Sequence, residues 1–215
     1  MNMTDMDEKA RIESAALERF LESGVYKVTL DEIAADLRIS KKTVYKFFPS
    51  KEDLLRAAVH MRMHRIERAV DEIVASDKPF EAKMTELLMV IGTLVRRLTK
   101  QFQVDLQRFA PRLWTEIDTF RRERVFSKMR KMFQQAKDEK VFREDLNIDL
   151  FFLVFLSTIQ GIMNPQTLSQ QSFSAEDAFH GIFKILFEGA LTQEARHNFK
   201  LFDEILQDDQ FTRTI

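Results

Sequence analysis

The chain has 215 residues with 33 basic and 34 acidic side chains, and 45% of its residues are hydrophobic, which is enough to bury a sizeable core. It contains no cysteine, which excludes disulfides and thiolate metal sites. Its 5 glycines and 4 prolines are too few for the many turns of an all-β fold, and helix-forming residues dominate instead. The composition therefore predicts an all-α protein.

The N-terminus and the longest apolar stretch argue against export and membrane insertion. Residues 1–10 are acidic and polar and lack the basic and apolar regions of a signal peptide. The apolar run at residues 150–156 is shorter than the roughly 20 residues that span a bilayer. Together with the absence of cysteine, these features predict a cytoplasmic protein.

The first three predicted helices are marked by local signals. Apolar residues recur at helical spacing over residues 7–23, and Gly24 follows as a C-cap. Thr29 and Glu32 form a capping box that opens a two-turn helix ending near residue 37. Ser40 caps a third helix over residues 41–47, which Pro49 ends.

Longer helices follow. Ser50 caps a helix over residues 51–75, and Pro79 begins one that ends near residue 99. A short helix at 102–109 precedes a long one at 111–140. Asn147 caps an apolar helix at 148–163, residues 166–173 form a polar loop, Ser174 caps a helix at 175–191, and an amphipathic helix covers 193–206.

A short basic stretch coincides with the third helix. Between residues 38 and 51 there are five bases and no acid, whereas acids are frequent on both sides. Two short helices joined by a tight turn, the second of them basic, are the helix-turn-helix pattern, which presents donors to nucleic acid. The window therefore predicts a site for DNA phosphates and base edges.

At this point the sequence resembles a known family. Residues 12–54 look like the N-terminal domain of the TetR family of bacterial regulators, chiefly through TLDEIA at 29–34 and SKKTVYKFFPSKEDL at 40–54. The family usually has glycine where Arg38 stands, at a position that tends to need a positive φ, which costs a non-glycine residue about 1 kcal/mol. A phosphate contact of Arg38 would recover part of that cost.

The resemblance implies a ligand-responsive regulator that binds a palindromic operator as a homodimer, most often as a repressor. It implies a helix-turn-helix domain at residues 1–50 and a larger helical domain for ligand binding and dimerisation at 51–215. The third helix would read the major groove, and Lys51 would pair with a phosphate. The implied DNA-binding residues are Thr29, Arg38, Ser40, Lys41, Lys42, Thr43, Tyr45, Lys46, Phe47 and Lys51.

The two apolar helices at 148–163 and 175–191 predict a dimer interface. Each has a broader apolar face than one neighbour can cover, and a two-fold four-helix bundle would cover both. The alternative is that both helices belong to the core of one chain. The residues assigned to the interface are Leu153, Leu156, Gln160, Phe179, Ile182, Phe183, Leu186 and Phe187.

The resemblance implies a ligand pocket among the middle helices. They are rich in Phe and Met, which favours a small apolar or amphipathic inducer, although such residues are more often core. The family places its inducer pocket in this region. The assigned residues are Leu88, Ile91, Phe102, Gln103, Leu106, Gln107, Trp114, Ile117, Phe133, Phe155, Thr158 and Ile159.

We find no catalytic, cofactor or metal motif. His60 and His64 share a helix face but lack a third ligand and the glutamate of the zinc-protease motif, so two ordinary helix histidines are the better interpretation. Two alternatives to a regulator stay open: a TetR-like adaptor that binds protein without reading DNA, and a plain helical ligand-binding protein. Neither would bind duplex DNA sequence-specifically.

Overall fold

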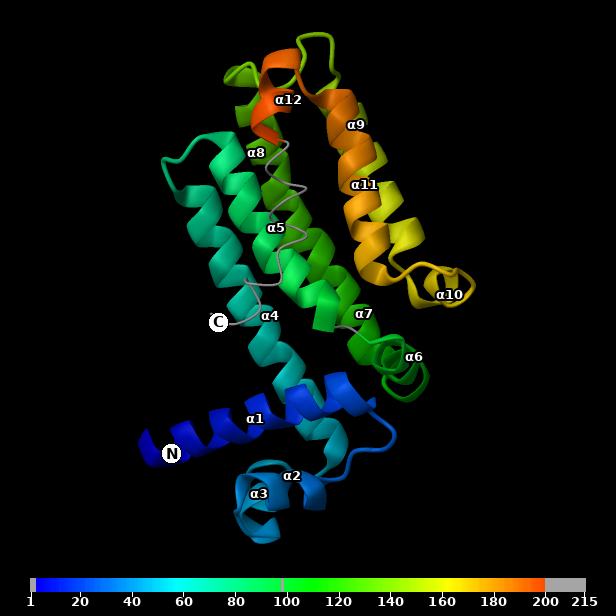
Figure 1. Cartoon of the computed structure of the whole chain (residues 1–215). Coiled ribbons are helices and arrows are strands. Elements are labelled where there is room, and N and C mark those ends of the chain that lie inside the picture. The colour runs from blue at the N-terminus through cyan, green and yellow to red at the C-terminus, as the bar shows by residue number, and fades with distance from the viewer. Residues whose placement is uncertain (1–2, 98, 200–215) are drawn as a thin grey trace. The chain divides into compact units, whose positions relative to one another are not determined.

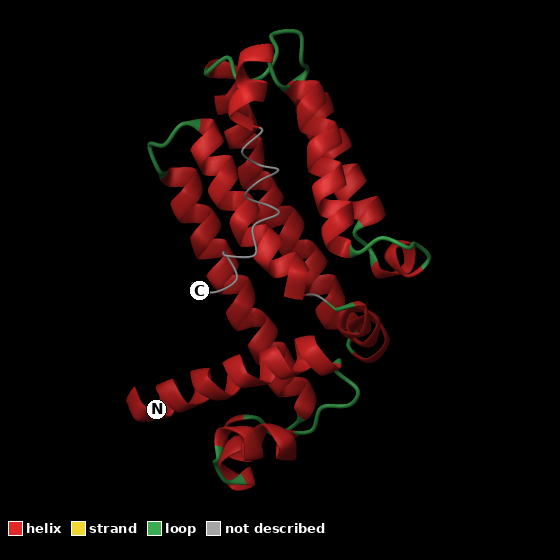
Figure 2. Ribbon diagram, in the orientation of Figure 1, coloured by secondary structure: helices red, strands yellow, loops and turns green. Residues whose placement is uncertain are grey.

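The computed structural model describes residues 3–97 and 99–199. Figures 1 and 2 show that its described elements are helices, and the only bridge among these residues pairs Phe142 with Leu191. The all-α prediction is confirmed. The helices are α1 (Met3–Ser23), α2 (Leu30–Leu37), α3 (Lys41–Phe47), α4 (Lys51–Ala75), α5 (Phe80–Arg97), α6 (Lys100–Phe109), α7 (Pro111–Phe120), the π-helix η1 (Arg121–Phe126), α8 (Ser127–Asp138), α9 (Ile148–Ile162), α10 (Pro165–Ser169), α11 (Ala175–Ala190) and α12 (Gln193–Phe199).

The contacts divide the chain into two compact units. The first unit, called the head unit, consists of the chain up to Ile66 together with Arg97–Phe120. The second, called the body unit, consists of Glu67–Arg96 and the described residues from Arg121 onward. Helices α6 and α7 therefore belong to the same unit as the helix-turn-helix, although they follow it by many residues. The predicted functional division between residues 50 and 51 is a separate matter and stays a prediction.

The head unit has one apolar core, to which the predicted inward faces contribute. The stripe of α1 meets Ile33 and Ala34 of α2, Val44 of α3 and the first turns of α4, all buried. Helix α6 completes this core with Phe102 and Leu106. Spacing of three and four residues puts these side chains on one face of each helix, which explains why short helices can share a core.

The body unit is built around aromatic rings. The centroid of the Phe133 ring on α8 lies 5.3 Å from the ring centroid of Phe151, 5.6 Å from that of Phe155 and 5.8 Å from that of Phe187. Most pairs in this cluster meet edge to face, the geometry that the ring quadrupole favours. Helices α8, α9 and α11 are thereby held together, and α9 and α11 lie side by side (Figure 1).

The predicted caps are confirmed at atomic detail. The Asn147 side chain accepts the Leu150 amide at 3.0 Å, and Ser174 forms a reciprocal capping box with Asp177. Gly24 has φ +80°, as a C-cap glycine does.

Two predicted elements were wrong. The single helix over 111–140 is interrupted by the π-turn η1, and a short helix, α10, occupies part of the predicted loop at 166–173 because Asn164 caps it. Of the predicted last helix, residues 193–199 are helical, and residues 200–206 lie outside the described residues. None of the helices described is long and apolar enough to cross a membrane.

Candidate nucleic-acid interface

The start of α2 is fixed by a complete capping box. The Thr29 hydroxyl accepts the Glu32 amide at 3.2 Å, and the Glu32 carboxylate accepts the Thr29 amide at 2.8 Å. The Thr29 hydroxyl also donates to that carboxylate and thereby holds the pKa of Glu32 below its usual value. Helix α2 therefore begins at a defined residue, which sets where the following turn lies.

The turn between α2 and α3 has the predicted left-handed residue. Arg38 has φ 55° and ψ 40°, and its amide reaches the carbonyls of Ala34 and Ala35. The expectation of a positive φ at this position is confirmed, with arginine in place of glycine. Arg11 of α1 donates to the Leu37 carbonyl at 3.2 Å and helps to satisfy the end of α2.

Helix α3 separates an inward from an outward face. Ser40 caps it by accepting the Thr43 amide at 3.0 Å, and Val44 and Phe48 are buried in the head-unit core. Phe47 packs partly against the same core. The outward face consists of exposed Lys41, Lys42, Tyr45 and Lys46, so α3 presents donors in the way that a reading helix does.

Acids already contact two of these lysines. The Lys41 ammonium lies 2.5 Å from a carboxylate oxygen of Asp31, and the Lys46 ammonium lies 2.7 Å from one of Asp5. Exposed Lys42 forms no ion pair with any of the residues that the structure describes. Because exposed ion pairs are weak and screened by salt, phosphates can replace these carboxylates.

Lys51 lies differently from the other predicted contacts. Its ammonium donates to the Tyr26 carbonyl at 3.0 Å and to the Val28 carbonyl at 2.8 Å. The side chain is only partly exposed, and its burial lowers the pKa of Lys51, which Asp105 and Glu32 partly offset. The ammonium group of Lys51, a residue of α4, therefore binds the backbone of the loop between α1 and α2.

One feature of the head escaped the sequence analysis. The Arg19 guanidinium of α1 grips both carboxylate oxygens of Asp36 on α2, at 2.5 and 2.9 Å. This bidentate pair ties α2, and with it the helix-turn-helix, to α1. The two residues are 17 positions apart, so no local pattern connects them.

The predicted pocket residues fall into two groups. Phe102, Gln103, Leu106, Gln107, Trp114 and Ile117 belong to the head unit, and Leu88, Ile91, Phe133, Phe155, Thr158 and Ile159 belong to the body unit. Phe102 and Leu106 are part of the head-unit core, and Phe133 and Phe155 belong to the aromatic cluster. These residues stay predictions as ligand contacts.

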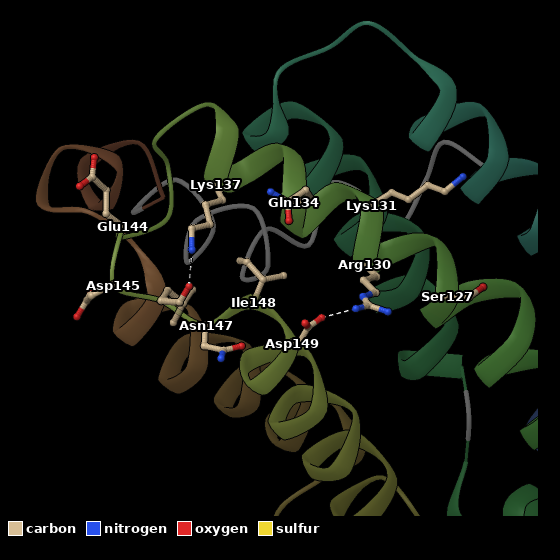
Figure 3. Close-up of a pocket in the computed structure, with 11 residues that line it drawn as sticks. Ser127, Arg130, Lys131, Gln134, Lys137, Glu144, Asp145, Asn147, Ile148 and Asp149 are labelled. Carbon is tan, nitrogen blue, oxygen red and sulfur yellow. Dashed lines mark hydrogen bonds and ion pairs between the residues drawn. The ribbon is translucent and has the colours of Figure 1, made fainter.

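A groove in the body unit has a different lining. Its volume is about 830 Å³, and Figure 3 shows that its lining comes from α8, from the loop at residues 144–147 and from the N-terminal end of α9. Arg130 pairs with Asp149 across it, and Lys137 donates to the Leu146 carbonyl. None of the predicted pocket residues lines this groove, and its charged side chains do not suit an apolar inducer.

The predicted dimer residues are also divided. Leu153 is 60% exposed and Gln160 is exposed, whereas Phe179, Ile182, Phe183 and Phe187 are buried within their own chain. Leu156 and Leu186 are partly buried. The exposed apolar side chains on these two helices include Leu150, Val154 and Ile185, which the sequence analysis did not assign to the interface.

No group of three or more metal-ligating side chains occurs among the described residues. The His60 ring lies 2.7 Å from a carboxylate oxygen of Glu116, which also pairs with Arg56. His60 is thus part of a polar contact between α4 and α7 within the head unit.

A capped two-helix motif with a basic outward face is the helix-turn-helix arrangement of DNA-binding transcription regulators. Residues 12–58 match the family described as bacterial regulatory proteins, tetR family, so the segment that carries the helix-turn-helix is similar to the DNA-binding part of these regulators. The match agrees with the all-helical plan and with the helix-turn-helix geometry described above.

Similar proteins support this assignment. An uncharacterised HTH-type transcriptional regulator, YvaF of Bacillus subtilis, is 24% identical over 82% of this chain and 92% of its own. The solved structure of a gamma-butyrolactone receptor has a TM-score of 0.62 at 16% identity and covers 95% of this chain and 99% of that one. FadR of Bacillus subtilis in complex with stearoyl-CoA has a TM-score of 0.58 at 17% identity, over 84% and 98%. The two structures share the fold.

Proposed function

We propose that this regulator binds a palindromic operator as a homodimer, acts in the cytoplasm as a repressor, and releases DNA when an apolar or amphipathic inducer binds. The observation that carries the proposal is the outward face of α3, which exposes Lys41, Lys42, Tyr45 and Lys46. The opposite face is fixed by Val44 and Phe48, which are buried in the head-unit core. Lys41 and Lys42 are at the N-terminal end of α3, where base edges are read, with Thr43 beside them.

The remaining contacts would position the duplex. Thr29 and Ser40 lie at the starts of two helices, whose free amides attract phosphate. Tyr45 and Lys46 would meet the sugar-phosphate backbone, and Arg38 and Phe47 would flank the helix. Such contacts fix the register without reading sequence.

Dimerisation would use the exposed stripes of α9 and α11. Leu150, Leu153 and Val154 on α9 are 59%, 60% and 41% exposed, and Ile185 on α11 is 73% exposed. Gly181 and Gly189 of α11 have open space where a side chain would stand. Apolar side chains gathered on two packed helices favour burial against a second copy, which leaves the inward phenylalanines to the core of each chain.

The inducer class rests on composition and on two neighbours in the fold. Those neighbours are a gamma-butyrolactone receptor and a regulator with stearoyl-CoA bound, so the fold accommodates amphipathic molecules. The aromatic and Met-rich middle helices favour the same chemistry here. Ligand and operator would then be reciprocal antagonists, because each favours a different arrangement of the same dimer.

The test is selection of duplexes from a random pool at near-physiological salt. We expect the wild-type protein to enrich a palindrome. We expect Lys41→Ala and Lys42→Ala to lower affinity for it by roughly 5- to 150-fold, since a base contact is worth about 1–3 kcal/mol. Lys131→Ala, an exposed lysine of the body unit, is the matched control. Enrichment of nothing by folded wild-type protein would favour the adaptor, and equal affinity of all variants would reject α3 as the reading helix.

A second experiment addresses the dimer. We expect Leu153→Glu together with Ile185→Glu to yield monomers in sedimentation equilibrium, because two charges would enter an apolar interface. Val104→Glu on α6 is the control, since Val104 is 43% exposed and lies outside the proposed interface. A dimer that survives the double substitution with unchanged affinity would place the interface elsewhere.

A further inference from the structure

The loop between α1 and α2 is held in place by hydrogen bonds between other helices and its backbone groups. Gly24 ends α1 with φ +80°, Val25 and Val28 are buried, and the Tyr26 side chain is 70% exposed. The loop is short and leads directly into Thr29, the residue that caps α2. Whatever fixes the backbone at Tyr26 and Val28 therefore also fixes where α2 begins.

Asp105 of α6 grips one side of this loop. Its Oδ2 accepts the Tyr26 amide at 2.8 Å, and its Oδ1 accepts the Gln101 side-chain amide at 2.5 Å. The residue is only 3% exposed, and a buried carboxylate is stable only when hydrogen-bonded. The approach is close, because a Cβ at Gly24 would lie 2.7 Å from Asp105 Oδ2.

Lys51 grips the other side. An ammonium group has three N–H donors, and Lys51 gives two of them to the Tyr26 and Val28 carbonyls. Turning toward a DNA phosphate would leave two loop carbonyls without this cation and would weaken its attraction to Asp105. The arrangement favours a cation that stays in place when DNA binds.

We propose that Lys51 and Asp105 are positioning residues for DNA recognition: they clamp the Tyr26 backbone from α4 and α6 and so orient α2 and α3, and Lys51 makes no phosphate contact. The inference rests on the proposed operator binding. It assigns part of DNA recognition to a helix, α6, that follows the helix-turn-helix by about fifty residues. The neighbouring bond from the Thr99 hydroxyl to the Leu21 carbonyl, at 2.8 Å, supports the same connection between α6 and the end of α1.

Salt dependence separates a positioning lysine from a phosphate contact. Each phosphate contact contributes about 0.9 to the slope of log affinity against log salt, so loss of one contact per subunit of a dimer lowers the slope by roughly 1.8. We expect Lys51→Met to weaken binding of the selected duplex about tenfold with an unchanged slope. Lys46→Met, on the outward face of α3, should lower the slope. A comparable fall in slope for Lys51→Met would overturn the proposal.

Hydrogen exchange tests the clamp without DNA. We expect Asp105→Ala to speed exchange of the Tyr26 amide and to weaken duplex binding, whereas Asp105→Asn keeps an acceptor and should preserve slow exchange and most of the affinity. An unchanged Tyr26 exchange rate in folded Asp105→Ala protein would overturn the proposal. If Asp105→Ala does not fold, faster exchange in Lys51→Met decides, since that variant removes the opposite half of the clamp. Because exchange is measured on free protein, it stands even if operator binding itself is disproved.

Discussion

In the DNA-free protein the Lys41 ammonium of the reading helix lies 2.5 Å from a carboxylate oxygen of Asp31 on α2. Both side chains are well exposed, so the pair is weak in itself. Its position matters more than its strength, because the acid lies beside the cation that would contact DNA. If α3 reads DNA as proposed, this carboxylate would lie where a phosphate or base edge binds and would oppose binding.

We expect Asp31→Asn to raise duplex affinity severalfold, because it replaces the charged partner of Lys41 with a neutral amide and removes a negative charge near phosphate. Filter binding or anisotropy at two salt concentrations measures the effect, which should shrink at high salt. Asp77→Asn, at an exposed acid between α4 and α5, makes the same charge change. Equal gains from the two variants would show that net charge alone is responsible.

Replacing Arg38 by glycine should stabilise the fold. Arg38 has φ 55°, a conformation that costs a non-glycine residue about 1 kcal/mol, and Arg38→Gly relieves that cost. Urea denaturation would report the gain as a higher midpoint. Arg38→Ala keeps the Cβ and loses the charge, so a similar gain from alanine would attribute the effect to charge instead.

The Arg19–Asp36 pair predicts a pH dependence. The guanidinium holds the pKa of Asp36 below its ordinary value of 3.8, so the stabilisation is present above that pH and is lost as pH falls through the lower value of the folded state. We expect wild type to be more stable than Asp36→Asn at pH 7 and the difference to shrink below about pH 4. Unfolding midpoints from pH 7 to 3 measure it. A difference that is constant with pH would contradict an ionic contribution.

Arg62 of α4 should be replaceable with a gain in stability. Its Nε is buried and has no hydrogen-bond partner within the described part of the chain, and burial lowers the pKa of Arg62. Apolar replacement of such a cation is often stabilising, so Arg62→Met should raise the free energy of unfolding by about 1 kcal/mol. Arg68→Met, at an exposed arginine of the same helix, should change little. A clear loss for Arg62→Met would show that this guanidinium has a favourable role.

Local sequence signals predicted well where the helices of the candidate interface begin. Thr29 and Glu32 are three residues apart, and both halves of their capping box are determined within one turn. The same holds for Ser40 and Asn147, whereas the positive φ of Arg38 was expected only from the family resemblance, which usually places glycine there. By contrast, no proline or glycine announces η1, so periodicity alone extended one helix through it.

Side-chain partners distant in sequence could not be predicted. The hydrophobic pattern of α9 and α11 shows that both are widely apolar, but not which residues turn inward, and it therefore assigned Phe183 and Phe187 to a partner chain. Similarly, the place of Lys51 at the start of α4 gives no sign of its hydrogen bonds to the Tyr26 and Val28 carbonyls. Both cases depend on tertiary packing.

The head-unit core is assembled from two stretches of sequence, since Phe102, Leu106, Ala110 and Leu113 of α6, α7 and the link between them close it against the first four helices. An exchange of the first fifty residues between relatives would pair a foreign α1 and α2 with resident α6 side chains. Chimaeras with new operator specificity would then fold only when the grafted segment suits the recipient's α6 surface. Recombination of reading heads during evolution would be limited by the same fit, so α6 should change together with the helix-turn-helix.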